Sequence, residues 1–330
     1  MPLPPRRVST DPGKATLGAA AAELGQQAGM PITVPPDAAA KPCAPVKDAP
    51  FWEALDRLAA GAGLRVAVRD AGRAVELVPK GASREVASTA GPFRVVARQV
   101  IGRALLAEGL TVHEVQIDFH WEPRYPVLRI DSYPHVTHAA DDRGVALQPQ
   151  AAGGKTQPTG SVHSASVKLG GVTRAAKRIG VLKGHFSVTA SEKLLAFQFK
   201  LPAAKAPPAV QEKEKVGAVL KSWKKEDDTW EAEVELAYPP TLPEFESFEA
   251  PSLTAANQVR LVGPGGKAFT PDSQAVNVAG RRVSATYYFK EDRAKGLIGP
   301  LGGDWAIELD VASTPLEFRV PFELRDVPLP

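Results

Sequence analysis

The sequence predicts a mainly β protein with an α+β N-terminal domain, a β-α-β-β-α-β-β unit, followed by two antiparallel β-sandwiches. Three observations lead to this fold class. Apolar residues recur at helical spacing only in the first part of the chain. From about residue 92 they alternate with polar residues, which is the period of strands with one buried face. Residues 203–214 show neither period and predict a linker between the two β regions.

Length and composition are typical of a folded chain with several domains. The 330 residues are 44% hydrophobic and 23% charged, and this size suits two or three domains of about 100 residues each. No apolar run is long enough for a transmembrane helix. The start, MPLPPRRVST, has no apolar segment of the kind that signal peptides contain, which leaves a cytoplasmic location open. The single cysteine, Cys43, cannot form an intramolecular disulfide.

Two helix–strand units in residues 1–80 predict the N-terminal domain. The helices are expected from about Leu17 and from Phe51, with glycines at their ends. Their buried stripes are Leu17, Ala20, Ala21, Leu24 and Ala28 in the first, and Phe51, Ala54, Leu55, Leu58 and Ala62 in the second. The expected extended segments are 6–10, 31–34, 43–46, 64–68 and 74–79. We expect the helices to pack on a small sheet.

Two segments of this region carry a family resemblance: EALDRLAAGAGLRV (53–66) and VELVP (75–79). With them, residues 6–80 resemble the short N-terminal domain of secretins and TonB-dependent receptors, known as the STN or secretin N0 domain. The resemblance implies a protein-contact domain of the bacterial cell envelope, in the periplasm or outside the cell, with another envelope protein as partner. The chain departs from the family at Ala59-Ala60, where larger apolar residues are more common, and in having no receptor barrel or secretin ring repeats.

The first β region, residues 92–202, shows its alternation in HEVQIDFHW (113–121) and LAFQFKL (195–201). The segments ADDRG (140–144) and LGG (169–171) are typical of turns between strands. The two alternating segments, 113–121 and 195–201, predict strands of one antiparallel sandwich.

The second β region, residues 215–330, contains about seven expected strands, which suits an immunoglobulin-like sandwich. Together the two regions resemble tandem immunoglobulin-like domains of no assigned family. Pro321 lies within the final expected strand, where the missing N–H favours a sheet edge. Among the expected strands are 229–238, 257–262, 275–278, 283–289, 305–311 and 316–330.

All six histidines lie in the middle region, which raises the alternative of a metal-dependent hydrolase. The sequence predicts no metal site, because the histidine spacings put neighbouring imidazoles on opposite faces of regular strands. His135 and His138 are the best pair, since a bulge in SYPHVTH could bring them to one face. No nucleophile motif is complete, GGKT (153–156) lacks the rest of a phosphate-binding loop, and no cofactor is expected.

Two features predict binding surfaces. The stretch 168–183 has no acidic residue and would either bind an anionic polymer or form a solvated basic hairpin. Its basic residues are Lys168, Arg174, Lys177, Arg178 and Lys183. The lack of aromatic residues there disfavours nucleic acid. Trp52 would either be an exposed anchor for a partner or pack against the neighbouring sandwich.

These observations favour a non-catalytic cell-envelope protein that acts in protein–protein interaction or assembly through its N-terminal domain. An edge strand or a helix face of that domain would contact the partner. A metal-dependent hydrolase in the His-rich middle domain and a carbohydrate-binding protein are the alternatives.

Overall fold

The computed structural model describes residues 2–11, 13, 16–105, 107, 110–173, 175–201, 209–242, 244–245, 259–299, 301 and 304–330. The chain is mainly β, as the alternation predicted, and divides into two compact units. We call Met1–Tyr125, Arg129–Thr189 and Glu317–Pro330 the N-terminal unit, and Pro126–Leu128 and Ala190–Leu316 the C-terminal unit. Among the described residues, no helix is long and apolar enough to cross a membrane.

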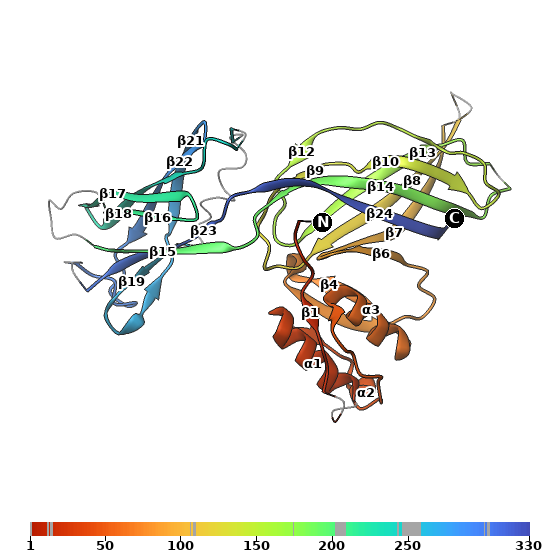
Figure 1. The fold of residues 1–330 in the computed structure, drawn as a ribbon, viewed down its shortest axis with the longest axis horizontal. Coiled ribbons are helices and arrows are strands. Elements are labelled where there is room, and N and C mark those ends of the chain that lie inside the picture. The colour runs from red at the N-terminus through yellow and green to blue at the C-terminus, as the bar shows by residue number, and fades with distance from the viewer. Residues whose placement is uncertain are drawn as a thin grey trace. The chain divides into compact units, whose positions relative to one another are not determined.

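The described part of the first 80 residues forms three α-helices and two small sheets, close to the expected order (Figure 1). The elements are β1 (Arg7–Val8), α1 (Leu17–Ala28), β2 (Ile32–Thr33), α2 (Pro36–Ala39), β3 (Ala49–Pro50), α3 (Phe51–Gly61), β4 (Leu64–Arg69) and β5 (Ala74–Pro79). Helix α1 ends at Gly29, whose φ of 68° is the left-handed conformation that glycine adopts without strain. The short helix α2 was not predicted, and the strand expected at 43–46 lies at 49–50 instead.

Strand β4 lies at the edge of a three-stranded sheet in the order β2-β5-β4, and β1 pairs with β3 in a separate ribbon. Helices α1 and α3 bury their apolar stripes in one core with this sheet. Leu24, Phe51 and Leu55 are fully buried there, and Val66 of β4 is 2% exposed. Burial of such a stripe, rather than helix propensity, stabilises helices of this length.

The rest of the N-terminal unit consists of two five-stranded sheets. The first has the order β11-β13-β8-β7-β6, and the second joins β10-β14-β9-β12 with β24 beside β14. The strands are β6 (Val86–Ala90), β7 (Phe93–Leu105), β8 (Leu110–Trp121), β9 (Val127–Asp131), β10 (His135–Asp141), β11 (Gln148–Pro149), β12 (Lys155–Thr156), β13 (Val162–Gly170), β14 (Arg178–Ala190) and β24 (Leu316–Pro328).

Aromatic side chains from the two sheets meet in a sandwich-like core. The rings of Phe119 on β8 and Phe186 on β14 lie 4.6 Å apart, and Phe322 of β24 lies 6.0 Å from Phe186. The alternation in 113–121 is confirmed, because Val115, Ile117, Phe119 and Trp121 are all at most 1% exposed. The turn at 140–144 is confirmed as well, since the Asp141 carboxylate accepts the N–H groups of Arg143 and Val145.

The C-terminal unit also has two sheets around one core, in the orders β15-β23-β19-β20 and β16-β17-β18-β22-β21. Phe197, Trp230, Tyr287 and Leu309 belong to this core. The strands are β15 (Leu194–Lys200), β16 (Ala209–Lys213), β17 (Val216–Glu226), β18 (Thr229–Ala237), β19 (Val259–Val262), β20 (Ala268–Phe269), β21 (Ser273–Ala279), β22 (Arg282–Lys290) and β23 (Ala306–Ala312).

Strand pairing differs from the expected division at three places. β15 was expected in the first sandwich, yet it pairs with β23 of the C-terminal unit. β24 was expected in the second sandwich, yet it pairs with β14 and returns the chain to the N-terminal unit. The expected linker 203–214 contains β16 at 209–213, while 202–208 lie outside the described residues. Alternation shows which face of a strand is buried but not which strand pairs with it. Pro321 does lie in an edge strand, as predicted.

Candidate functional site

The tryptophan of α3 joins the α+β part to the first sheet of the N-terminal unit. The Trp52 indole N–H donates to the carbonyl of Pro92 at 3.0 Å, just before β7. Its ring lies 6.3 Å from the His120 ring on β8, and the side chain is 1% exposed. The prediction of Trp52 as an exposed anchor is therefore wrong. Burial on this second face of α3, next to the stripe of Phe51, leaves no indole surface for a partner.

An ion pair supports the same contact. The Arg94 guanidinium of β7 donates two hydrogen bonds, of 3.0 and 2.9 Å, to the carboxylate of Asp56 on α3. The Arg94 side chain is 5% exposed, so the Asp56 carboxylate, rather than water, compensates its positive charge. The buried Glu122 carboxylate, at the end of β8, accepts the backbone N–H of Arg6 at 2.8 Å. The α+β part and the sheet thus share polar contacts as well as apolar ones.

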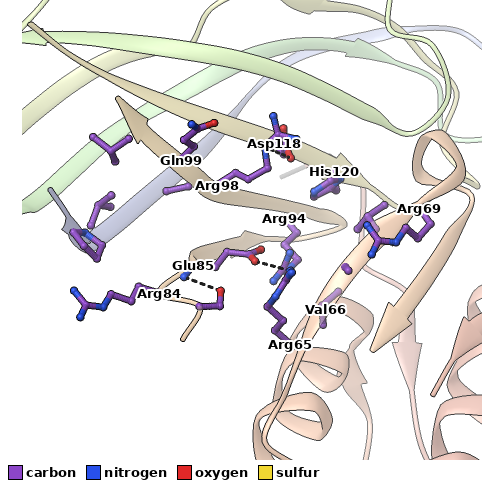
Figure 2. A pocket seen from close by; sticks show the side chains of 17 residues that line it. Arg65, Val66, Arg69, Arg84, Glu85, Arg94, Arg98, Gln99, Asp118 and His120 are labelled. Carbon is purple, nitrogen blue, oxygen red and sulfur yellow. Dashed lines mark hydrogen bonds and ion pairs between the residues drawn. The ribbon is translucent and has the colours of Figure 1, made fainter. Parts of the chain in front are cut away.

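Beside this contact lies a groove of about 470 Å³ that is rich in arginine (Figure 2). We call it the arginine groove. One wall is β4, residues 65–69; the other is formed by residues 83–85 and by β7 at 97–100. The guanidinium groups belong to Arg65, Arg69, Arg84, Arg94 and Arg98, against the carboxylates of Glu85 and Asp118. The groove has the size of ordinary ligand clefts, and its lining carries three more positive than negative side chains.

A bulge in β7 directs one of these arginines. Ala97 pairs with Ile117 and Gln99 pairs with Gln116, so that Arg98 is the extra residue of a β-bulge. Bulges commonly re-aim a side chain, and Arg98 lies on the groove, 3.5 Å from the Asp118 carboxylate. β6 pairs with β7 only as far as Ala97, so the edge of β7 beside the groove has no strand partner among the described residues beyond that point.

Two of the guanidinium groups are held by carboxylates but keep donors for a ligand. Arg65 contacts Glu85 at 3.0 Å, and Arg69 contacts Glu76 at 2.9 Å. Each guanidinium has five N–H donors, so one carboxylate does not saturate it. Arg84 is exposed and makes no ion pair within the described part of the chain. The arrangement can bind carboxylates or other planar anions through paired hydrogen bonds.

His120 forms part of the groove floor and is 6% exposed. Burial lowers the pKa of its imidazole to about 3, and the positive charges of Arg94 and Arg98 add to this effect. The ring is therefore neutral at physiological pH. The alternation in 113–121 placed His120 on a polar face, but Trp52 covers that face at this position.

The expected basic surface at 168–183 is divided between the two sheets. Lys168 lies on β13 of the first sheet, whereas Arg178 and Lys183 lie on β14 of the second, so the predicted hairpin does not form. Lys183 contacts Glu323 at 2.9 Å and Arg178 contacts Asp326 at 3.7 Å, both on β24. Lys177 is exposed just before β14. Arg174 lies outside the described residues.

Two of the six histidines in the middle region are in contact with each other. His135 pairs with His185 across β10 and β14, with their rings 4.8 Å apart, beside a hollow of about 320 Å³. A bulge between Val136 and His138 places His138 opposite Lys183, on the same face as His135. The residues described include no group of three or more His, Cys, Asp or Glu side chains able to hold a metal ion.

The arginine groove was not predicted from the sequence, because its five arginines are dispersed over three segments. A compositional signal existed: residues 57–103 contain eight arginines and one lysine. Arginine in place of lysine is typical of sites that bind carboxylates or phosphates bidentately. A search for one continuous basic run cannot detect such a site.

Comparison of the chain with protein-family models, with curated proteins and with solved structures found no match in any of the three.

Proposed function

We propose that the chain is a non-catalytic binding protein that holds an anionic segment of a partner protein in the arginine groove. The observation that carries the proposal is that five arginines, from the α+β part and the adjacent sheet, line one groove of about 470 Å³, with Arg94 itself paired to Asp56. Arginine is enriched at interface hot spots, and its planar group matches carboxylates.

The surroundings of the groove favour recognition over catalysis. The buried His120 has its pKa lowered to about 3, so it is a poor proton acceptor near neutral pH. Glu85 and Asp118 each contact an arginine, at 3.0 and 3.5 Å. The lining therefore offers mainly hydrogen-bond donors and positive charge, which suit the binding of an anion.

We further propose the bacterial cell envelope as the location and an STN-like role for the α+β part. Support comes from the resemblance of residues 6–80, with a helix–strand unit at 17–33 and another at 51–69. The groove uses β4 of this part, so the partner would contact the same domain that the resemblance implicates. We also propose that the paired sheets of the two units have an immunoglobulin-like topology.

Charge reversal in the groove tests the proposal. We expect fluorescein-labelled heptaglutamate to bind the full chain in an anisotropy titration, and heptalysine not to bind. Arg84→Glu/Arg98→Glu should weaken heptaglutamate binding at least tenfold, or about 1.4 kcal/mol, because it replaces two donors by repelling carboxylates.

The matched control is Lys168→Glu/Lys177→Glu, which changes the net charge equally on residues that do not line the groove. It should leave binding within about twofold, since screening limits the reach of surface charges to about 10 Å at 0.1 M salt. Equal weakening by both double variants would mean that heptaglutamate responds to overall charge, and the proposal would be wrong.

A further inference from the structure

The free edge of β4 runs along the arginine groove. All five residues from Arg65 to Arg69 line the groove. β4 is the last strand of its sheet, and β5 is its one strand partner within the described residues. An edge strand presents unpaired N–H and C=O groups that can accept another strand.

The hydrogen bonds of β5 show which β4 groups point into the groove. Lys80 donates its N–H to the Gly63 carbonyl at 3.1 Å, and Val75 donates its N–H away from β4, to Pro31, at 2.9 Å. Bonded and non-bonded pairs alternate in an antiparallel ladder, and Val75 is the register partner of Val68. Leu64, Val66 and Val68 therefore direct their backbone groups away from β5, toward the groove.

The side chains of β4 divide between the two faces of the sheet. Leu64 and Val66 are in the core with the helices. Arg65 and Arg69 alternate with them and lie on the opposite face. A strand added beside β4 would place every second side chain on the arginine face. Carboxylates at alternate positions of that strand would meet Arg65, Arg69, Arg98 and Arg84 around the groove (Figure 2).

We propose that the occupant of the arginine groove is an extended acidic segment that pairs with β4 as an additional strand, with aspartate or glutamate at every second residue. This inference rests on the proposed function and names the conformation and pattern of its ligand. The backbone pairing supplies affinity, and the arginines select the acidic pattern.

Two heptapeptides of equal composition test the pattern. In one, glutamate and threonine alternate, with four glutamates; in the other, the four glutamates precede the three threonines. Anisotropy titration of the full chain should show the alternating peptide binding at least tenfold more tightly, because only this order brings all four carboxylates to the arginine face.

N-methylation of the alternating peptide tests the strand pairing. In a strand beside β4, either the glutamate or the threonine N–H groups point to β4. Methylation of two N–H groups of that set should weaken binding at least tenfold, whereas methylation of two from the other set should change it less than threefold. The variant Arg84→Glu/Arg98→Glu should weaken the binding of both the alternating and the grouped heptapeptide.

The outcomes separate the inference from the proposed function. Equal binding of the alternating and grouped peptides, or equal tolerance of both methylation sets, would overturn strand addition and leave an anion-binding groove. Binding of none of the peptides would overturn the proposed function as well, and the arginines would then serve to keep the β4 edge from pairing with other chains.

Discussion

Trp52→Ala is expected to lower the free energy of unfolding of the N-terminal unit by about 3–5 kcal/mol, the usual cost of truncating a buried tryptophan. The indole is 1% exposed, contacts Phe51 at 5.0 Å between ring centroids, and donates to Pro92 at 3.0 Å. Its removal would leave a cavity between α3 and the first sheet, and the Pro92 carbonyl would keep only its hydrogen bond from the Glu122 N–H, at 3.1 Å. Urea unfolding followed by far-UV circular dichroism measures the loss.

Trp52→Phe is the control for this substitution. It keeps most of the ring volume and loses only the hydrogen bond to Pro92, so we expect a loss of about 1 kcal/mol. If Trp52→Ala cost no more than an exposed substitution, below about 0.5 kcal/mol, the contact between α3 and the sheet would not stabilise the unit, and the groove beside it would have no rigid wall.

Acidification is expected to destabilise the protein through His120. Its folded pKa of about 3 lies below the ordinary 6.5, so the unfolded chain takes up the proton first as the pH falls. The contribution to stability is complete above pH 6.5 and is lost progressively between 6.5 and 3, at about 1.4 kcal/mol per pH unit. At pH 5 the expected loss is about 2 kcal/mol.

Comparison with His120→Leu isolates this effect. The variant cannot take up the proton, and it removes a buried Nδ1 atom that has no hydrogen-bond partner among the described residues. Burial also lowers the pKa of His113, His163 and His185 and raises that of Glu122. These groups are present in both proteins and cancel in the difference. Parallel stability curves from pH 7 to pH 5 would contradict the assignment.

Local patterns in the sequence predicted most of the strands and helices. The stripe from Leu17 to Ala28 became α1, and the alternating segment 229–238 became β18 at 229–237. These patterns report the burial of each residue, which local periodicity encodes. They do not report partners: the same alternation in β15 and β24 is compatible with either unit, and the pairing observed is set by contacts far apart in the chain.

The candidate site was less predictable than the fold. Arg65, Arg84 and Arg98 lie on β4, on the segment before β6, and on a bulge of β7. None of these placements has a local signature, because the groove exists only where β4 of the α+β part lies beside residues 83–85 and β7. The burial of Trp52 and His120 has the same origin. The alternation in 113–121 predicts that the outer face of β8 is exposed to solvent, but Trp52 of the α+β part covers it at His120.

Amide hydrogen exchange of the full chain with bound heptaglutamate shows whether the ligand binds in the arginine groove, because it locates the ligand on the protein. We expect slower exchange in peptides that cover residues 64–69 and 97–100, with little change in residues 162–185. Slower exchange confined to residues 162–185, or to the C-terminal unit, would contradict the assignment of the arginine groove as the binding site.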